Sequence, residues 1–319
     1  MQKKWKKSSL DIEVLKMAKI TVKELFEILN EDLKDLIVFN VKTNDKGNSY
    51  PVFSSNKMRE LDEYLISYMK DAGHHEISDL AELMEYVIIF SHELAHCLNK
   101  HSTYKPEEKI ESVVMEGLAD IMAGRIATAF YTYGTNLKKV IAEKYNIADQ
   151  NLRDRNTFCI LMGKALSKLY FEFYRENSSK GYPPPAQRVA LNITGITSFF
   201  YRSPKYQGIR GDYTAVNIKL TLSLDSSILS DISETCSNNK SVDEFMQKVL
   251  ELHLKIQGNE EQINDIGSPD LKHIFGTKYI EASKEIKELH REHLKEEMFH
   301  YAKIKGITHL IDESFFQDE

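Results

Sequence analysis

The sequence predicts an α+β fold that is predominantly helical and carries a small antiparallel sheet. Most of the chain shows apolar residues at spacings of three and four, which is the period of an amphipathic helix. One stretch near residue 40 alternates apolar and polar residues instead, as a half-buried strand does. Hydrophobic residues make up 42% of the 319 residues and charged residues 28%, so the chain has enough apolar material for a sizeable core.

The first 71 residues predict a helix, a β-hairpin and a second helix. Apolar residues recur at spacings of two to four over 9–35, which favours a helix. Over 37–54 an alternating pattern flanks the turn-forming stretch NDKGN, residues 44–48, which is typical of a hairpin. A helical pattern returns over 56–71. The small sheet is therefore expected to include residues 37–54.

Two long helices are predicted next. Ser78 or Asp79 is suited to cap the first, and an apolar stripe at 3-4 spacing follows over 80–98. Pro106 and the two acids after it suit the first turn of the second helix, which should run to about Tyr133. These two helices carry the candidate functional residues of the chain.

The rest of the chain is predicted to be mostly helical. Alternation favours a strand over 216–224, although its leucines leave a helix open, and helices are expected over 136–146, 151–177, 186–201, 242–257 and 279–304. Pro204, Gly208 and Gly211 cluster in 203–213. This cluster predicts a boundary between a first domain, 1–203, and a mostly helical C-terminal region of unknown role, 204–319.

The totals exclude several classes of protein. The net charge is −6, with no broad basic field, so nucleic acid is not an expected partner. No apolar run is long enough to span a bilayer, and no apolar core of a signal peptide follows the basic N-terminus, so no membrane association is expected. The three cysteines are scattered, which fits neither a disulfide framework nor a cysteine metal knuckle. A cytoplasmic location is expected.

The stretch FSHELAHCLNKHS, residues 90–102, contains a candidate metal site. His92 and His96 are four apart, so on a helix both imidazoles can turn to one ion. Glu93 is rotated by about 100 degrees from His92, so it can lie beside the ion without binding it. This is the logic of the H-E-x-x-H zinc motif, in which the glutamate is a general base. The alternative is a core helix with two hydrogen-bonded histidines.

A third ligand is predicted on the following helix. Glu116 and Asp120 are four apart on one face of an apolar segment, where a buried acid needs a partner. Glu116 can bind the ion, and Asp120 can accept the free N–H of a ligating histidine. Small residues near them should let this helix approach the first closely. Glu111 is a weaker ligand candidate, and an ordinary i,i+4 face paired with Arg125 is the alternative.

The spacing His92-Glu93-x-x-His96, nineteen residues, Glu116-x-x-x-Asp120 resembles the gluzincin metallopeptidases. HELAHCLNKH followed by EGLAD is also similar to the M48-type peptidases and to the Lit-type phage-exclusion peptidases. The resemblance covers roughly residues 80–200. It implies a zincin-like pair of active-site helices, makes 1–203 a metallopeptidase domain, and gives Glu116 the role of third ligand.

The Lit-type resemblance extends to YPPPAQRVALNITGI, residues 182–196. Lit-like proteins have a histidine before proline in this segment, then Arg-Ile or Arg-Val and an asparagine; here Tyr182 precedes the proline, and Arg188 and Asn192 follow. In gluzincins a histidine or tyrosine donates to the oxyanion, so Tyr182 is the candidate donor. Arg188 is a candidate to clamp a substrate carbonyl or to hold Asp120; the alternative is a surface arginine or a structural ion pair.

Other histidine clusters are weaker candidates for a metal site. HHEISD, residues 74–79, mimics the motif but contains the expected helix cap, so its side chains would not share one face. His101 lies five residues past His96, off the ligand face, and is expected to be exposed or to stand behind a ligand. His290, His293 and His300 lie on a charged helix and are expected to face solvent.

The sequence therefore predicts a cytoplasmic zinc endopeptidase that acts on a protein or peptide. His92, His96 and Glu116 would hold Zn²⁺, Glu93 would be the general base, and Tyr182 or Arg188 would steady the oxyanion. The alternative is a non-catalytic binding protein whose zinc only staples helices. The Lit-type resemblance further implies a bacterial, often prophage-borne, enzyme of phage defence that cuts a host translation factor.

Overall fold

The structure is a computed structural model of the chain. It describes residues 20–33, 39–44, 53–57, 64–145, 154–175, 181–202, 212–236 and 239–258, and the single positions 147, 152, 275, 296, 299, 303 and 308. The described residues confirm a predominantly helical fold with a small antiparallel sheet.

The helices in chain order are α1 (Val22–Leu33), α2 (Lys70–Gly73), α3 (Leu80–Leu98), α4 (Lys109–Tyr133), α5 (Thr135–Tyr145), α7 (Arg155–Lys168), α8 (Pro185–Arg202), α9 (Asp212–Thr221), α10 (Ser226–Cys236) and α11 (Asn239–Gln257). A 3-10 turn, η2 (His101–Thr103), follows α3, and a π-helical turn, η3 (Leu169–Tyr174), continues α7. The strands are β1 (Ile20–Thr21), β2 (Phe39–Asn44), β3 (Phe53–Lys57), β4 (Tyr64–Met69) and β5 (Glu76–Ile77).

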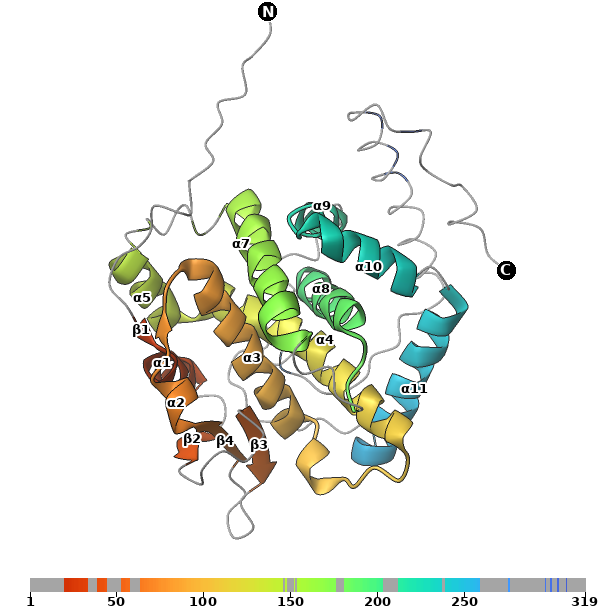
Figure 1. The fold of residues 1–319 in the computed structure, drawn as a ribbon, viewed down its shortest axis with the longest axis horizontal. Helices are drawn as coiled ribbons and strands as arrows, with labels where there is room; N and C mark the ends of the chain where they lie inside the picture. Colours follow the sequence, from red (N-terminus) through yellow and green to blue (C-terminus); the bar gives the residue numbers. More distant parts are fainter. Residues whose placement is uncertain are drawn as a thin grey trace, which may run out of the picture.

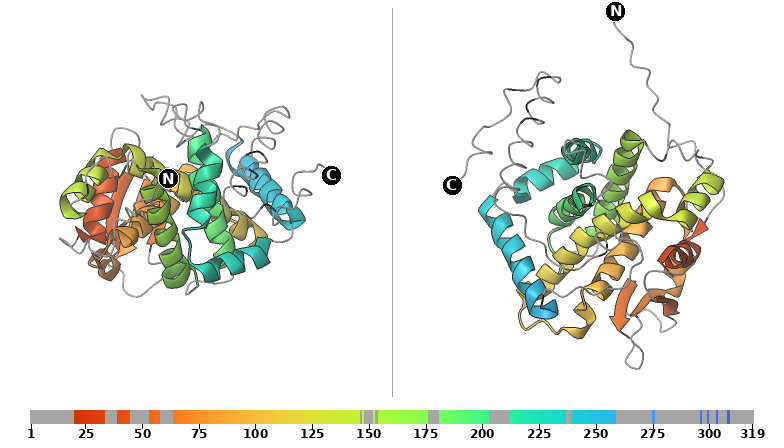
Figure 2. Two further views of the ribbon diagram at one scale, coloured as in Figure 1. Left: turned by 90° about the horizontal axis from the view of Figure 1, so that it is seen from above. Right: turned by 180° about the vertical axis from the view of Figure 1, so that it is seen from behind.

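Helices α3 and α4 run side by side through the middle of the molecule (Figure 1). Strands β3 and β4 pack beside α3 at one end, whereas α8 lies along α4 and is covered in turn by α9 and α10. The view from behind shows α11 against the N-terminal end of α4 (Figure 2). The two central helices are therefore enclosed from both sides, and their facing side chains lie in the interior.

The predicted hairpin over 37–54 is wrong in its pairing. Strand β2 lies within this stretch and β3 begins at its end, but β4 lies between them and pairs with both, parallel to β2 and antiparallel to β3. The helix predicted over 56–71 is also wrong, because 64–69 is this central strand. Pairing on two sides outweighs a local apolar pattern that a helix also fits. A second, antiparallel sheet joins β1 to β5, so the described part of the predicted helix 9–35 begins with two strand residues and is helical from Val22 to Leu33; residues 9–19 and 34–35 lie outside the described residues.

Helix α3 forms as the sequence predicts. Asp79 is its N-cap, and the carboxylate accepts a hydrogen bond from the Glu82 amide at 2.8 Å. The helix ends at Leu98, where Asn99 is the C-cap and Lys100 adopts a left-handed conformation with φ of 56°. Sixteen of its nineteen residues are buried, so the histidine motif lies on a core helix.

The predicted helix from Pro106 to Tyr133 is confirmed as α4, which starts slightly later, at Lys109. Glu108 and Glu111 form a reciprocal capping box at its start. Gly124 of this helix lies against α8, a neighbour that the sequence analysis did not indicate. A Cβ atom at Gly124 would overlap the backbone of Asn192 in α8, and one at Gly195 of α8 would overlap the Ile121 carbonyl of α4. The close approach is thus between α4 and α8.

The predicted strand over 216–224 is wrong, because α9 occupies 212–221. The buried apolar residues there are Val216, Leu220 and Leu224, which are four apart, whereas Leu222 is 59% exposed. The predicted helices 136–146, 151–177, 186–201 and 242–257 are confirmed by α5, by α7 with η3, by α8 and by α11. Of the predicted helix 279–304 the structure describes only positions 296, 299 and 303, each of them helical, and the boundary at 203–213 stays a prediction.

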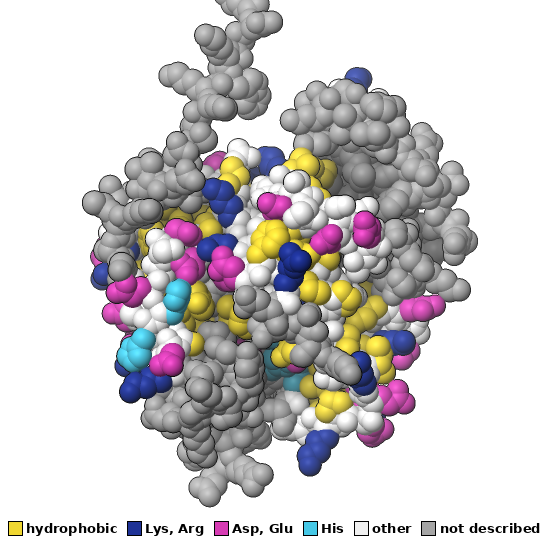
Figure 3. Space-filling view, in the orientation of Figure 1, with side chains coloured by type: hydrophobic (Ala, Val, Ile, Leu, Met, Phe, Trp, Pro, Cys, Tyr) yellow, Lys and Arg dark blue, Asp and Glu magenta, His cyan; other side chains and the backbone are white. Residues whose placement is uncertain are grey.

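One face of the molecule shows how the charged side chains of the described residues are distributed. Acidic and basic side chains are interspersed over the described part of the face in Figure 3, without a broad basic field. Among the helices that the structure describes, none combines the length and the apolar character needed to cross a membrane.

Candidate metal centre

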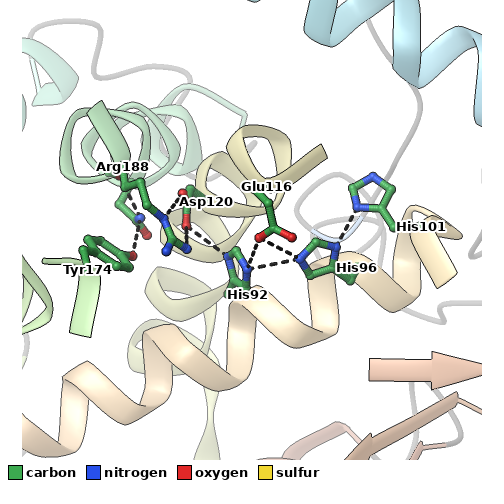
Figure 4. Close-up of polar contacts among 8 residues, drawn as sticks. His92, His96, His101, Glu116, Asp120, Tyr174 and Arg188 are labelled. Carbon is green, nitrogen blue, oxygen red and sulfur yellow. Dashed lines mark hydrogen bonds and ion pairs between the residues drawn. The ribbon is translucent and has the colours of Figure 1, made fainter. Parts of the chain in front are cut away.

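Three side chains from α3 and α4 converge on one point between the two helices (Figure 4). The Nε2 atoms of His92 and His96 are 3.1 Å apart. Glu116 Oε2 lies 3.1 Å from the first nitrogen and 3.4 Å from the second. All three side chains are largely buried, with 11%, 12% and 18% of their surface exposed. The predicted ligands are thus brought together into a group that could hold a metal ion.

The spacing of these three atoms fits a tetrahedral ion. Ligand atoms about 2.0–2.1 Å from a zinc are separated from one another by about 3.3 Å when the angles are tetrahedral. The observed separations of 3.1, 3.1 and 3.4 Å match that value. Two imidazoles and one carboxylate are also a donor set that zinc takes in catalytic sites, with a fourth position left for water or substrate.

The charges of the centre also suit a cation. Burial opposes the charge on Glu116, but the charges and hydrogen bonds of His96 and His92 outweigh it and hold the pKa of Glu116 well below its usual range. Burial lowers the pKa of His92, yet Asp120 and Glu116 together raise it to about 10. The buried carboxylates therefore stabilise a positive charge at this position, and either a proton or a metal ion can supply it.

Asp120 lies where a partner for His92 is expected. Its Oδ1 is 3.0 Å from His92 Nδ1, a distance that meets a hydrogen bond although the ring N–H is not aimed straight at the oxygen. Asp120 is fully buried, and burial would raise its pKa. The charges of Arg188 and His92 outweigh that effect, so the pKa of Asp120 is lowered. The carboxylate thus stays charged behind the ring.

Arg188 binds Asp120 through two nitrogen atoms of its guanidinium group. Its Nε and Nη2 donate to the two carboxylate oxygens at 2.8 and 3.0 Å, and the arginine side chain is only 4% exposed. Of the two predicted roles, the geometry favours holding Asp120 over clamping a substrate. The crossing of α4 and α8 sets this pair, because Asp120 and Arg188 each lie one turn before the residues that touch at the crossing, Gly124 and Asn192.

Two further residues support Arg188 and were not assigned roles from the sequence. The Tyr174 ring lies 4.0 Å from the guanidinium carbon, in a cation–π contact. Asn192 donates to the Tyr174 hydroxyl at 3.1 Å and to the Arg188 carbonyl at 3.0 Å. Tyr174 belongs to η3, and a π-helical turn is a feature that no apolar period in the sequence announces.

His101 was expected to be exposed or to stand behind a ligand, and the structure places it behind His96. Its Nδ1 lies 2.8 Å from His96 Nδ1, and the residue is only 4% exposed. Burial lowers the pKa of His101 well below its usual range. On a continuous helix a residue five positions after His96 would not share its face. His101 reaches His96 because α3 ends at Leu98 and the chain then turns back.

Tyr182 and Glu93 lie at the edge of the centre. The Tyr182 ring is 4.7 Å from the guanidinium carbon of Arg188. Burial first, and then the negative charge of Glu116, raise the pKa of Tyr182 to about 12, with Glu93 close enough to add to the effect. Glu93 is half-buried, unlike the fully buried apolar residues on either side of the motif. The structure thus brings both residues to the same site.

The weaker ligand candidates are located elsewhere. Glu111 caps α4 and accepts hydrogen bonds from Tyr104 at 2.9 Å and from Lys255 at 2.9 Å, so it is not part of the centre. In the stretch 74–79, Asp79 caps α3 and His75 contacts Glu82 at 2.6 Å. His290, His293 and His300 lie outside the described residues.

Comparison with known proteins adds no assignment. No family model, curated protein or solved structure matches this chain. The function is therefore argued from the geometry of the centre and from the motif that builds it.

Proposed function

We propose that this chain is a zinc-dependent endopeptidase that hydrolyses peptide bonds of an intracellular protein. The observation that supports it most is the convergence of His92 Nε2, His96 Nε2 and Glu116 Oε2 with the spacing of a tetrahedral zinc. A glutamate stands directly after the first of these ligands, on the less buried side of the helix. Within this proposal, α3 and α4 are the active-site helix pair of a zincin-like enzyme.

In this proposal each polar residue at the centre has a defined task. Bound zinc supplies a Lewis acid that activates water and polarises the scissile carbonyl. Glu93 takes a proton from the attacking water and passes it to the leaving amine. Tyr182, kept protonated by its raised pKa, donates to the oxyanion that forms at the carbonyl. Asp120 and Arg188 do not touch the substrate; they hold the His92 ring in place.

The neighbouring sheet supports a peptide substrate. Strand β3 contacts α3 and η2, and thus passes beside the helix that carries His92 and His96. It forms one edge of the three-stranded sheet and pairs, among the described strands, with β4 alone. An extended peptide can add to such an edge through its backbone and bring a bond toward the centre.

A purely structural zinc is less consistent with the packing. Helices α3 and α4 share the main hydrophobic core, to which both contribute many fully buried residues, so their association does not depend on an ion. A structural site also needs no general base, yet Glu93 is present. The resemblance to the Lit-type peptidases extends the proposal to an enzyme of phage defence.

The decisive variant is Glu93→Gln, which keeps the shape of the side chain and removes the base. New protein termini should be mapped in cells that express the parent chain, the Glu93→Gln variant, or the Glu27→Gln variant. Glu27 is 61% exposed on α1 and serves as the matched control. We expect the parent and Glu27→Gln to produce the same new termini and Glu93→Gln to produce none, while it still binds zinc.

Two outcomes would contradict the proposal. Equal cleavage by Glu93→Gln and the parent would remove the base from the mechanism. Identical termini in all three samples and in cells without the protein, combined with stoichiometric zinc in the parent, would favour the zinc-stapled binding protein.

A further inference from the structure

The contact between His96 and His101 joins the two imidazoles through the same atom of each ring. The Nδ1 atoms are 2.8 Å apart, which is a short hydrogen bond (Figure 4). Two N–H groups cannot face each other at this distance, so one Nδ1 carries the proton and the other accepts it. The contact therefore fixes a pair of tautomers and is more specific than simple packing of two rings.

The direction of this hydrogen bond follows from the other nitrogen of His96. Its Nε2 points to His92 Nε2 and Glu116 Oε2, in the group that could hold a metal. A ligating nitrogen must offer a lone pair, so the proton of His96 belongs on Nδ1. His96 then donates, and His101 accepts through Nδ1 and carries its own proton on Nε2.

The backbone is bent in a way that delivers His101 to this position. Lys100, directly before it, is the one non-glycine residue of the described chain with a positive φ, at 56°. Glycine is the usual residue at such a turn after a helix, because a Cβ atom is unfavourable there. The left-handed turn ends α3 and sends η2 back over it, which places His101 beside a residue one and a half turns earlier in the helix.

The turn is also anchored at its far end. Thr103 donates its hydroxyl to the Lys100 carbonyl at 2.8 Å, and the Tyr104 hydroxyl donates to Glu111 at the start of α4. Lys255 of α11 contacts the same carboxylate and lies 5.3 Å from the centre of the Tyr104 ring. Contacts from two other helices thus hold η2, and with it His101, in place.

We infer that His101 is a positioning residue for the metal centre, which orients the His96 ring and fixes its proton on Nδ1 through a neutral imidazole. This inference rests on the proposed function, since it concerns the same site. It adds a second support to the centre, independent of the carboxylate support that Asp120 gives to His92. The sequence left open whether His101 is exposed or stands behind a ligand, and the contact with His96 decides for the second.

The first test measures zinc affinity by competition with a chromophoric chelator in four proteins. His101→Ala should weaken binding about 10- to 100-fold, which is the usual effect of losing such a partner. His101→Asn should stay within about threefold of the parent, because the asparagine oxygen sits where Nδ1 accepts. His74→Ala removes an exposed histidine and should not change the affinity.

The outcomes separate this inference from the proposed function. If the parent itself does not bind zinc, the proposed function fails. If the parent binds and His101→Ala binds equally well, or if His101→Asn loses as much as His101→Ala, the positioning role fails. The visible spectrum of the cobalt-substituted proteins adds a readout of ligand geometry, which should change in His101→Ala and be restored in His101→Asn.

A second measurement needs no variant, and it stands if His101→Ala does not fold. In the ¹⁵N-labelled, zinc-loaded parent, a coupling across the hydrogen bond should connect the Nδ1 atoms of His96 and His101, with the proton on His96. A proton found on Nδ1 of His101, or no coupling between the two nitrogens, would overturn the inference.

Discussion

The two halves of helix α3 bury polar groups in different ways. In the N-terminal half Glu85 is only 5% exposed, and burial, with the nearby acids Glu172, Glu82 and Asp79, raises its pKa to about 8 against the opposing charge of Lys168. In the C-terminal half His92 faces the fully buried Asp120, whose pKa is lowered. Two buried carboxyl groups thus show opposite shifts in pKa, and the more deeply buried one, Asp120, is the one that stays charged.

The difference lies in the partners. Glu82, in the same half as Glu85, shows what partners achieve, because Ser78 and His75 donate to its carboxylate and its pKa is lowered despite burial. The C-terminal half goes further and joins several charged groups from three helices into one network. A chain keeps charge in its interior only where compensating contacts are built. Here they are built around the candidate metal centre.

The largest effect expected is that of Asp120→Ala, which would break the network of the C-terminal half. It leaves Arg188 buried without its carboxylate, and loss of one partner of a buried pair costs about 3–5 kcal/mol. Urea unfolding of the metal-free protein measures this cost. Lys23→Ala, in an exposed i,i+4 pair, is the control and should cost less than about 0.5 kcal/mol. Equal costs for the two variants would contradict the comparison.

A smaller effect, with a defined dependence on pH, is expected in the N-terminal half. The pKa of Glu85 is higher in the folded chain than the usual 4.5, so the folded state binds the extra proton. The free energy of unfolding should therefore fall as pH rises from about 4.5 to 8, by at most about 1.4 kcal/mol per pH unit. Glu85→Gln removes this loss and should be more stable than the parent at pH 8.

Glu82→Gln is the matched variant for that experiment. Its carboxylate is stabilised in the folded state, so removing the charge should destabilise the protein at pH 8, opposite in sign to Glu85→Gln. Urea unfolding of both variants at pH 5, 6, 7 and 8 separates them. If both variants shift stability in the same direction at pH 8, the account of partnered and unpartnered acids is wrong.

Much of the centre could be predicted from the sequence because it lies on helices. A helix fixes which side chains share a face, so His92 and His96 follow from their spacing of four, and Glu116 with Asp120 from theirs. The Asp79 cap and the apolar stripe likewise located α3. Where local geometry alone decides the arrangement, the sequence is a sufficient guide.

Other features depend on contacts between distant segments and were missed, misplaced or left open. Strand β4 owes its structure to two neighbouring strands, and Gly124 of α4 lies against the backbone of α8, which no local pattern specifies. His101 reaches His96 only because Lys100 takes a left-handed conformation. Over 216–224, spacings of two and of four coincide, so only the burial of Val216, Leu220 and Leu224 decides for a helix.

The central claim is that His92, His96 and Glu116 bind one metal ion, and the zinc content of two variants on one helix tests it most directly. The purified parent, Glu116→Ala and Glu111→Ala should be dialysed against zinc and their bound metal measured per folded chain. We predict one zinc in the parent and in Glu111→Ala, whose side chain caps α4 and contacts Tyr104 and Lys255 without reaching the centre, and a loss of zinc in Glu116→Ala. Stoichiometric zinc retained by Glu116→Ala would contradict the account.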